Sequence, residues 1–239
     1  MRKESICCPP ANEALRRCGE ILSGLGLRVA DTYINDMAHL IAPVPTPKEY
    51  AGEFLSRSDN PITICGGNID PSDYETHRVV DFLKDPFYLA DNAAITAECA
   101  VRLLGEQLPD LFNCRILILG WGRIGKCLGK FLQQIGANVT IAARKESDLA
   151  MIHALGYQAA PIQKIHQEVR CYDAILNTVP AMILPDLQFD GVAIELASKP
   201  GMNGTNIISA RGLPGKMAPE KSGELIARTF LRLALSREE

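Results

Sequence analysis

The chain has 239 residues, enough for two small domains, and its 47% hydrophobic and 22% charged residues are ordinary for a globular protein. Its net charge of −3 at pH 7 argues against nucleic acid or an anionic membrane surface as a partner, because such partners select clustered basic residues. No apolar run approaches the ~18 residues of a membrane-spanning helix, and the N-terminus lacks a signal-peptide core.

The eight cysteines form no CxxC pair, and several fall in predicted core segments, where free cysteine behaves as a small hydrophobic residue. A reducing, cytoplasmic location is the simplest expectation for such a chain. The four histidines lack ligand spacing to one another or to the cysteines, so we expect no metal site.

Apolar runs alternate with helical patterns along the chain, which predicts an α/β fold without internal repeats. Residues 1–92 are expected to form a first lobe, in which a helix that starts at a proline and a second, short helix alternate with the strands of a parallel sheet. The strands are predicted over 4–8, 27–30, 38–45 and 61–67, and the helices over 10–26 and 48–57.

A hinge helix is predicted over 90–108, with Thr96 as its N-cap and Glu98 in its first turn. A second lobe over 93–217 then alternates strands and helices. Its strands are predicted over 115–120, 137–144, 173–180, 191–198 and 205–210, and its helices over 123–135, 146–156 and 162–169.

The remaining segment, 218–239, is predicted to be a helix with Pro219 as its first residue. One face of this helix is formed by Leu225, Ile226, Thr229, Phe230 and Leu233. We expect this face to be buried against the first lobe or the hinge helix.

The segment RILILGWGRIGKCLGKF, residues 115–131, has a G-x-G-x-x-G pattern between a predicted strand and a predicted helix. Gly120 allows the tight turn, Gly122 lets the backbone approach a pyrophosphate, and Gly125 lets the helix pack on the strand. Free N–H groups at the helix N-terminus would bind the phosphates. We therefore expect a dinucleotide on this turn, which also contains Trp121, Arg123 and Ile124. A purely structural glycine turn is the alternative.

The end of the second strand of this lobe decides which dinucleotide is favoured, because an acid there would bind the ribose 2′-hydroxyl of NAD. The sequence instead has Ala143, Arg144, Lys145 and, two residues later, Ser147. Cationic and hydroxyl donors suit a 2′-phosphate, which favours NADP over NAD. Solvated charges at a helix start are the alternative interpretation.

Four segments carry a family resemblance: GWGRIGKCLGKFLQQIGANVTIAARKESDLAMIHALGYQ, DAILNTVPAMIL, IELASKPG and RGLPGKMAPEKSGELIA. In their order and spacing they resemble the family of the dipicolinate synthase A-subunit, and NAAITAECAVRLL resembles the helix that contains this family's TAEG motif. The likeness covers roughly residues 85–235.

The resemblance implies two Rossmann-like, doubly wound parallel-sheet lobes with a cleft between them, the first flavodoxin-like or Rossmann-like lobe carrying part of the substrate site. It implies NAD(P)-dependent oxidation of dihydrodipicolinate, a small cyclic dicarboxylate, or of its hydrated precursor, to dipicolinate during sporulation, together with a flavoprotein-like B-subunit. We also expect a homodimer.

Several departures leave the substrate open. The first lobe is shorter than in the family, a helix is missing after Gly201, Cys99 replaces the TAEG glycine, and Arg211 replaces a proline.

Candidate site residues lie where strands end, because open α/β sheets bind ligands outside the carboxyl ends of their strands. At one end, Asn177 and Thr178 could bind the nicotinamide ribose, with Val179 and Pro180 shaping the turn; a plain strand-to-loop turn is the alternative. At the next end, which includes Leu196 and Ala197, Ser198 and Lys199 could hold the nicotinamide amide or a substrate carboxylate. A solvated lysine is the alternative there.

The segment GLPGKMAP, residues 212–219, could form a closing flap through Gly212 and Pro214. Glu98 could be a general base, although the helix dipole equally explains an acid in a first turn. Lys199, Ser198 and Glu98 are therefore the candidate catalytic residues.

The leading hypothesis is an NADP-dependent oxidoreductase. One alternative is a non-catalytic NADP-binding regulatory subunit. Another is an enzyme similar to D-2-hydroxyacid dehydrogenases, although the arginine and histidine pair expected of such an enzyme has no evident counterpart.

Overall fold

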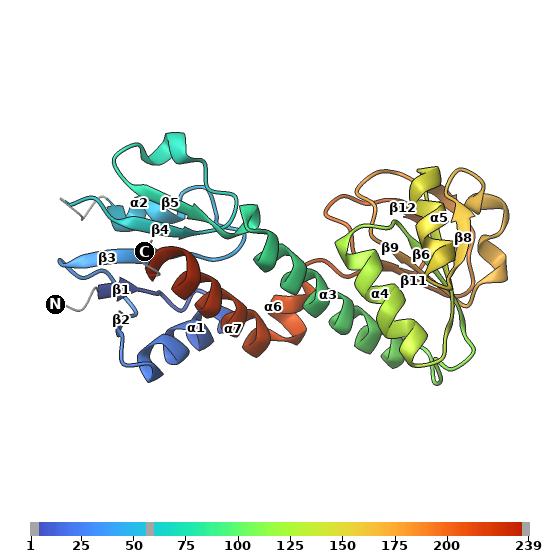
Figure 1. The fold of residues 1–239 in the computed structure, drawn as a ribbon, viewed down its shortest axis with the longest axis horizontal. Helices are drawn as coiled ribbons and strands as arrows, with labels where there is room; N and C mark the ends of the chain where they lie inside the picture. Colours follow the sequence, from blue (N-terminus) through green and yellow to red (C-terminus); the bar gives the residue numbers. More distant parts are fainter. Residues whose placement is uncertain (1–4, 56–59, 236–239) are drawn as a thin grey trace. The chain divides into compact units, whose positions relative to one another are not determined.

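The computed structural model describes residues 5–55 and 60–235 and divides into two compact units (Figure 1). Unit 1 contains the chain up to Asn92 together with the segment from Pro214, and unit 2 runs from Ala93 to Leu213. Helix α3 (Pro86–Gln107) begins in unit 1 and ends in unit 2. No helix in the described part of the chain has both the length and the apolarity needed to cross a bilayer.

Unit 1 contains a five-stranded, all-parallel sheet with the strand order β2-β1-β3-β4-β5, which is the order of flavodoxin-like sheets. Its strands are β1 (Ser5–Cys7), β2 (Arg28–Ala30), β3 (Met37–Ile41), β4 (Thr63–Gly66) and β5 (Arg78–Asp81). Its helices are α1 (Glu13–Gly24), α2 (Tyr50–Leu55), most of α6 (Leu213–Met217) and α7 (Pro219–Phe230), with 3₁₀ turns at Pro71–Tyr74 and Phe82–Lys84. The edge strand β5 was not predicted, because it is short and only half-buried.

Helix α1 starts later than predicted, at Glu13 rather than at a proline. Asn12 is its N-cap, and the Asn12 side chain accepts a hydrogen bond of 2.9 Å from the N–H of Leu15. The sequence reasoning chose the proline and missed an asparagine, which is among the best capping residues.

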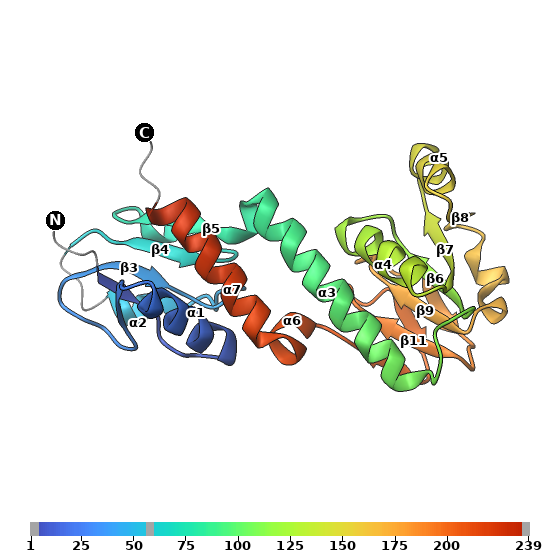
Figure 2. The same cartoon turned by 60° about the horizontal axis from the view of Figure 1, so that its bottom comes forward.

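Helix α7 lies alongside α1 on one face of the unit 1 sheet (Figure 2). The prediction of its buried face is confirmed, since Leu225, Ile226, Thr229 and Phe230 are all at most 4% exposed. Leu233 is half-buried in the π-helical turn Leu231–Leu235 that follows. The two helices approach closely at Gly223, where a Cβ atom would lie 2.6 Å from the carbonyl oxygen of Ala14.

The hinge helix α3 begins at Pro86, so the prediction of Thr96 as an N-cap and of Glu98 in the first turn is wrong. The N–H of Tyr88 donates a hydrogen bond of 2.7 Å to the Asp85 carboxylate, which acts as the cap instead. Arg232 also pairs with Asp85. Burial acts to raise the pKa of Asp85, but the hydrogen bonds from Arg232 and Tyr88 and the charge of Arg232 outweigh it and hold this pKa below its ordinary value.

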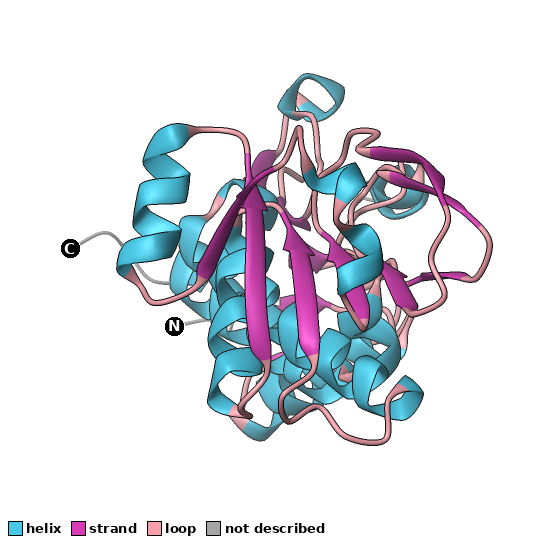
Figure 3. Ribbon diagram, turned by 90° about the vertical axis from the view of Figure 1, so that its right-hand side faces the viewer, coloured by secondary structure: helices cyan, strands magenta, loops and turns pink. Residues whose placement is uncertain are grey.

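Unit 2 contains a six-stranded parallel sheet with the order β13-β11-β9-β6-β7-β8. Counted along the chain within this sheet, the order is that of dinucleotide-binding doubly wound folds. The strands are β6 (Arg115–Leu119), β7 (Asn138–Ala143), β8 (Gln158–Pro161), β9 (Ala174–Asn177), β11 (Val192–Glu195) and β13 (Ile207–Ser209). Figure 3 shows the long strands of this sheet pointing the same way. The doubly wound α/β fold class is thereby confirmed.

The two faces of the unit 2 sheet are covered differently. Helix α4 (Arg123–Gln134) packs on the face that carries Ile118 and Ile141, and α5 (Glu146–Ala154) follows β7. On the opposite face no long helix lies among the described residues. It is covered by a two-stranded sheet of β10 (Leu184–Leu187) and β12 (Met202–Gly204) and by 3₁₀ turns at Ile165–Gln167 and Val169–Cys171. These turns replace the single helix predicted over 162–169.

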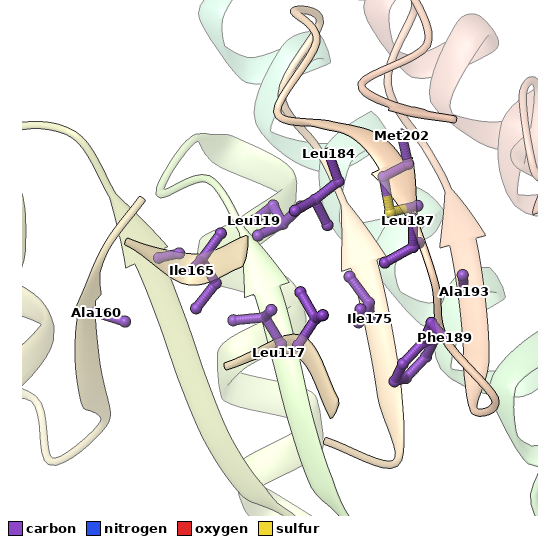
Figure 4. Packing of buried hydrophobic residues seen from close by; sticks show 12 residues of the cluster. Leu117, Leu119, Ala160, Ile165, Ile175, Leu184, Leu187, Phe189, Ala193 and Met202 are labelled. Atoms are coloured by element: carbon purple, nitrogen blue, oxygen red, sulfur yellow. The ribbon is translucent and has the colours of Figure 1, made fainter. Parts of the chain in front are cut away.

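The core on that second face joins the small sheet to the large one (Figure 4). Leu184, Leu187 and Met202 from the two-stranded sheet pack with Leu119 and Ile175 from the six-stranded sheet. All five side chains are at most 4% exposed, so the short crossovers bury apolar surface that crossover helices bury in most doubly wound sheets.

All eight cysteines are free thiols, and five of them are buried. Burial raises the pKa of both Cys7 and Cys65 to about 12, which keeps these thiols protonated and unreactive. Their interpretation as small hydrophobic residues is confirmed.

Candidate functional site

The predicted site residues of unit 2 follow four strands that are neighbours in the order β11-β9-β6-β7. The loop after β11 carries Ser198 and Lys199, the loop after β9 starts at Thr178, the glycine turn follows β6, and Arg144 follows β7. Because parallel strands end at the same edge of a sheet, these four groups lie in a row. The row spans three strand spacings, about 14 Å, and the strand order reverses between β6 and β9, where such sheets bind dinucleotides.

The glycine turn after β6 requires glycine at two positions for different reasons. Gly120 has a φ angle of +103°, and a Cβ there would lie 2.7 Å from Thr178 Oγ1 and 2.8 Å from Val179 Cγ2. A Cβ on Gly125 would lie 2.2 Å from the carbonyl oxygen of Gly120, so only glycine lets α4 pack this closely on the turn.

Gly122 differs from its two neighbours in the motif, because a Cβ there would meet nothing within 4 Å. It is the N-cap of α4, no side chain caps this helix, and its first turn contains no acidic residue. Open space thus lies beside the exposed Gly122 at the start of α4, where the first N–H groups have no partner within the helix and the helix dipole favours an anion. The residues present fit a pyrophosphate.

The other residues of the turn lie around this N-terminus. Trp121 is half-buried, with its ring 5.9 Å from that of Tyr157 and with the ammonium group of Lys126 5.5 Å above it. Arg123, the first residue of α4, is exposed, and Ile124 is half-buried. Trp121 therefore contacts Lys126 of α4 and Tyr157, and Arg123 places an exposed cation beside the turn.

The end of β7 carries the residues predicted to distinguish NADP from NAD. Ala143 is buried as the last residue of the strand, and Arg144, Lys145 and Ser147 are exposed. Lys145 is the N-cap of α5 without a side-chain capping bond, and Glu146 begins the helix. The cations therefore lie on the surface of the row, one strand away from the glycine turn.

The loop after β9 is joined to the glycine turn by hydrogen bonds. The hydroxyl of Thr178 donates to the carbonyl oxygen of Leu119, 2.8 Å away. The Asn177 side chain is fully buried, donating to the carbonyl oxygen of Val179 at 3.0 Å and accepting from the Val179 N–H at 3.0 Å. Asn177 thus points into the protein and shapes the loop, and Pro180 is exposed at its tip.

Sequence reasoning missed Glu195, the last residue of β11. Its carboxylate is only 4% exposed and accepts four hydrogen bonds, from the Asn177 side chain and from the backbone N–H groups of Ala197, Gly201 and Met202. A charged residue at the end of an apolar strand was the available signal, because such residues are rarely buried without partners.

The remaining candidates lie in different environments. Ser198 and Lys199 are exposed in the loop after β11, whereas Leu196 and Ala197 are buried at its start. Glu98 is half-buried in the interior of α3.

Gly212 belongs to unit 2, and Pro214 is the first residue of the C-terminal segment of unit 1. Between Leu213 and Met217 the segment expected to form a flap is the short helix α6.

Comparison with known proteins gives the chain's relatives. It is 30% identical to the A-subunit of dipicolinate synthase from Bacillus subtilis (strain 168), over 59% of this chain and 52% of that protein. The crystal structure of the same A-subunit from Bacillus halodurans has a TM-score of 0.81 at 19% identity and covers 98% of this chain and 99% of that one. The chain resembles the A-subunit of dipicolinate synthase. The resemblance inferred from the motifs is thus confirmed.

The match to the curated A-subunit spans about half the length of that protein. No protein-family model matches the chain. The fold is also that of dehydrogenases: the structure of Salmonella D-lactate dehydrogenase has a TM-score of 0.65 at 11% identity and covers 98% of this chain and 97% of that one.

Proposed function

We propose that the chain is an NADP-dependent oxidoreductase that acts, like the A-subunit of dipicolinate synthase, on a small cyclic dicarboxylate, oxidising dihydrodipicolinate to dipicolinate. The observation that carries this proposal is the glycine turn, where a tightly packed Gly120–Gly125 pair holds an uncapped, acid-free helix start beside the open position of Gly122. When bound there, NADP would supply a nicotinamide ring that accepts hydride.

The charges along the row support an orientation of the cofactor with its 2′-phosphate at the end of β7 and its nicotinamide near the loops after β9 and β11. Arg144, with Lys145 and Ser147, would bind the 2′-phosphate at the β7 end, because charge-assisted hydrogen bonds to phosphate are stronger than neutral ones. The loop after β9, with Thr178, Val179 and Pro180, and the start of the loop after β11, with Leu196 and Ala197, would line the nicotinamide ribose end.

The substrate end of the proposal rests on Ser198 and Lys199. The Lys199 ammonium group is a point charge suited to a substrate carboxylate, and the Ser198 hydroxyl can donate or accept beside it. Gly212 and Pro214 are proposed as further contacts of the cofactor, and Glu98 as a proton acceptor. The cytoplasm, where NADP is available, is the proposed location.

The resemblance also supports a complex, because the relative is by name one subunit of an enzyme. We therefore propose two partners: a flavoprotein-like B-subunit, and a second copy of this chain in a homodimer. A non-catalytic NADP-binding role is the second candidate function, and the exposure of both Ser198 and Lys199 favours it, since catalytic side chains are commonly held in place by packing.

The test begins with cofactor binding by the full chain. Trp121 is the one tryptophan and lies in the glycine turn, so energy transfer from it to the reduced nicotinamide reports binding. NADPH is expected to bind, and failure of both NADPH and NADH to bind would refute the proposal. Oxidation of dihydrodipicolinate is then measured with and without a B-subunit relative. Activity only with the partner supports the enzyme, and binding without turnover in either mixture selects the non-catalytic candidate.

A further inference from the structure

We propose that Glu195 is a positioning residue whose buried carboxylate holds two loops of the row, 178–181 and 196–202, in one arrangement against the glycine turn. This inference rests on the proposed function of that row of strand ends. It assigns a role in cofactor binding to a side chain that is nearly inaccessible to solvent.

The contacts show how one carboxylate holds both loops. Oε1 of Glu195 accepts from Nδ2 of Asn177 at 2.8 Å and from the Ala197 N–H at 3.0 Å. Oε2 accepts from the Gly201 N–H at 2.8 Å and from the Met202 N–H at 3.2 Å. Both ends of the exposed segment 198–200 are therefore bound to the same side chain.

The chemistry of these four partners requires an acceptor at both oxygens. A carboxylate only accepts hydrogen bonds, and its two oxygens can take all four donors. A glutamine of the same shape would set its NH₂ group against two N–H donors in either orientation. The geometry therefore selects glutamate over its neutral analogue, although the two have almost the same size.

The 178–181 loop is connected to the glycine turn through Asn177. The side-chain amide of Asn177 bonds to both the N–H and the carbonyl oxygen of Val179, and Val179 and Thr178 together limit the space beside Gly120. Gly201 closes the other side, because a Cβ there would lie 2.3 Å from Nδ2 of Asn177. A displacement of the Glu195 carboxylate would thus reach the turn that holds the pyrophosphate.

The experiment compares Glu195→Gln with Glu106→Gln, the same change at an exposed glutamate of α3. Amide hydrogen exchange is measured in the full chain, and NADPH is titrated through energy transfer from Trp121. In Glu195→Gln, the amides of 197–202 should exchange about tenfold faster and NADPH should bind about tenfold more weakly, as expected for buried donors left without an acceptor. Exchange in Arg115–Leu119 should be unchanged, and Glu106→Gln should match the wild type.

Asn177→Ser is a milder variant in case Glu195→Gln does not fold, because it removes only the link to the 178–181 loop. It should weaken NADPH binding and leave the exchange of 197–202 unchanged. An unaltered NADPH affinity in either folded variant would overturn the proposal. Faster amide exchange in Arg115–Leu119 together with the loops would also overturn it. If the wild type binds neither NADPH nor NADH, the proposed function fails, while faster exchange confined to the loops in Glu195→Gln would still support the positioning role.

Discussion

Helices α1 and α4 occupy equivalent places in their units, because each follows the first strand of a parallel sheet. Their N-termini nevertheless differ. Helix α1 is capped by the side chain of Asn12 and has Glu13 in its first turn, whereas α4 begins at Gly122 with neither a side-chain cap nor an acid. The Asn12 amide and the Glu13 carboxylate thus compensate the start of α1 within unit 1, whereas the start of α4 has no such compensation, and our proposal assigns that role to a bound anion.

This difference shows that a doubly wound topology offers a helix start at each first crossover, but local residues decide whether it binds an anion. The glycines at the start of α4 leave its backbone accessible: Gly122 leaves space beside the helix start, while Gly120 and Gly125 let the helix and the strand pack closely. Three sets of substitutions test this comparison: in the glycines of the turn, at the cation Arg144, and at the N-caps of α1 and α4.

Gly125→Ala should have the largest effect. A Cβ placed 2.2 Å from the carbonyl oxygen of Gly120 forces α4 away from the turn, and such overpacking costs about 3 kcal/mol of unfolding free energy. We expect NADPH binding to fall by more than about a hundredfold. Denaturant unfolding and energy transfer from Trp121 measure the two effects.

Gly122→Ala is the matched control for this change, because a Cβ there has open space. It should change the unfolding free energy by less than about 1 kcal/mol while still weakening NADPH binding, since the methyl group stands where the pyrophosphate would approach the backbone. Equal loss of stability in the two variants would contradict this account of the turn.

The motif and the sheet explain how much of this could be predicted from the sequence. The strand, glycine turn and helix over 115–134 follow from the apolar run and the spacing of Gly120, Gly122 and Gly125. The observed strand and helix start where predicted, and each ends one residue earlier. The loops after β9 and β11 were also found, because apolar strands ended there in polar residues.

Other features depend on partners that are distant in sequence. Glu195 meets Asn177, 18 residues away, only after β9 and β11 pair, so the partner of its carboxylate cannot be read from neighbouring residues. The start of α3 was predicted several residues late because Asp85 and Pro86 were not recognised as a cap and a first helical residue. Strands β10 and β12 pair with each other although β11 lies between them in the sequence, and neither is long enough to show a period.

Arg144→Ala should have the next largest effect, on the choice of cofactor. Loss of a charge-assisted contact to the 2′-phosphate costs roughly 1.5–3 kcal/mol, or about ten- to a hundredfold in NADPH affinity, and NADH binding should hardly change. Salt should weaken NADPH more than NADH, because Arg144 is exposed and screened.

Calorimetric titration of both cofactors into wild type, Arg144→Ala and Lys130→Ala, an exposed cation on α4, tests this. Equal affinity of the wild type for NADPH and NADH would refute the NADP assignment. An equal loss of both in Arg144→Ala would mean that this arginine serves the structure.

The smallest effect is expected from exchanging the two helix starts. Asn12→Ala removes the acceptor of the Leu15 N–H and should lower the unfolding free energy by about 1 kcal/mol, without a change in NADPH affinity.

Gly122→Asn gives α4 the cap that α1 has, because Gly122 is already extended at φ −80° and ψ −169°, as an N-cap residue is. Its amide would accept from the first N–H groups of α4, leaving stability unchanged or slightly higher, but it would compete with the pyrophosphate for the same donors. NADPH binding should therefore weaken more than in Gly122→Ala, which adds bulk without an acceptor. Thermal unfolding and NADPH titration of the three variants are the measurements, and NADPH binding by Gly122→Asn as tight as by wild type would show that the phosphates do not use the start of α4.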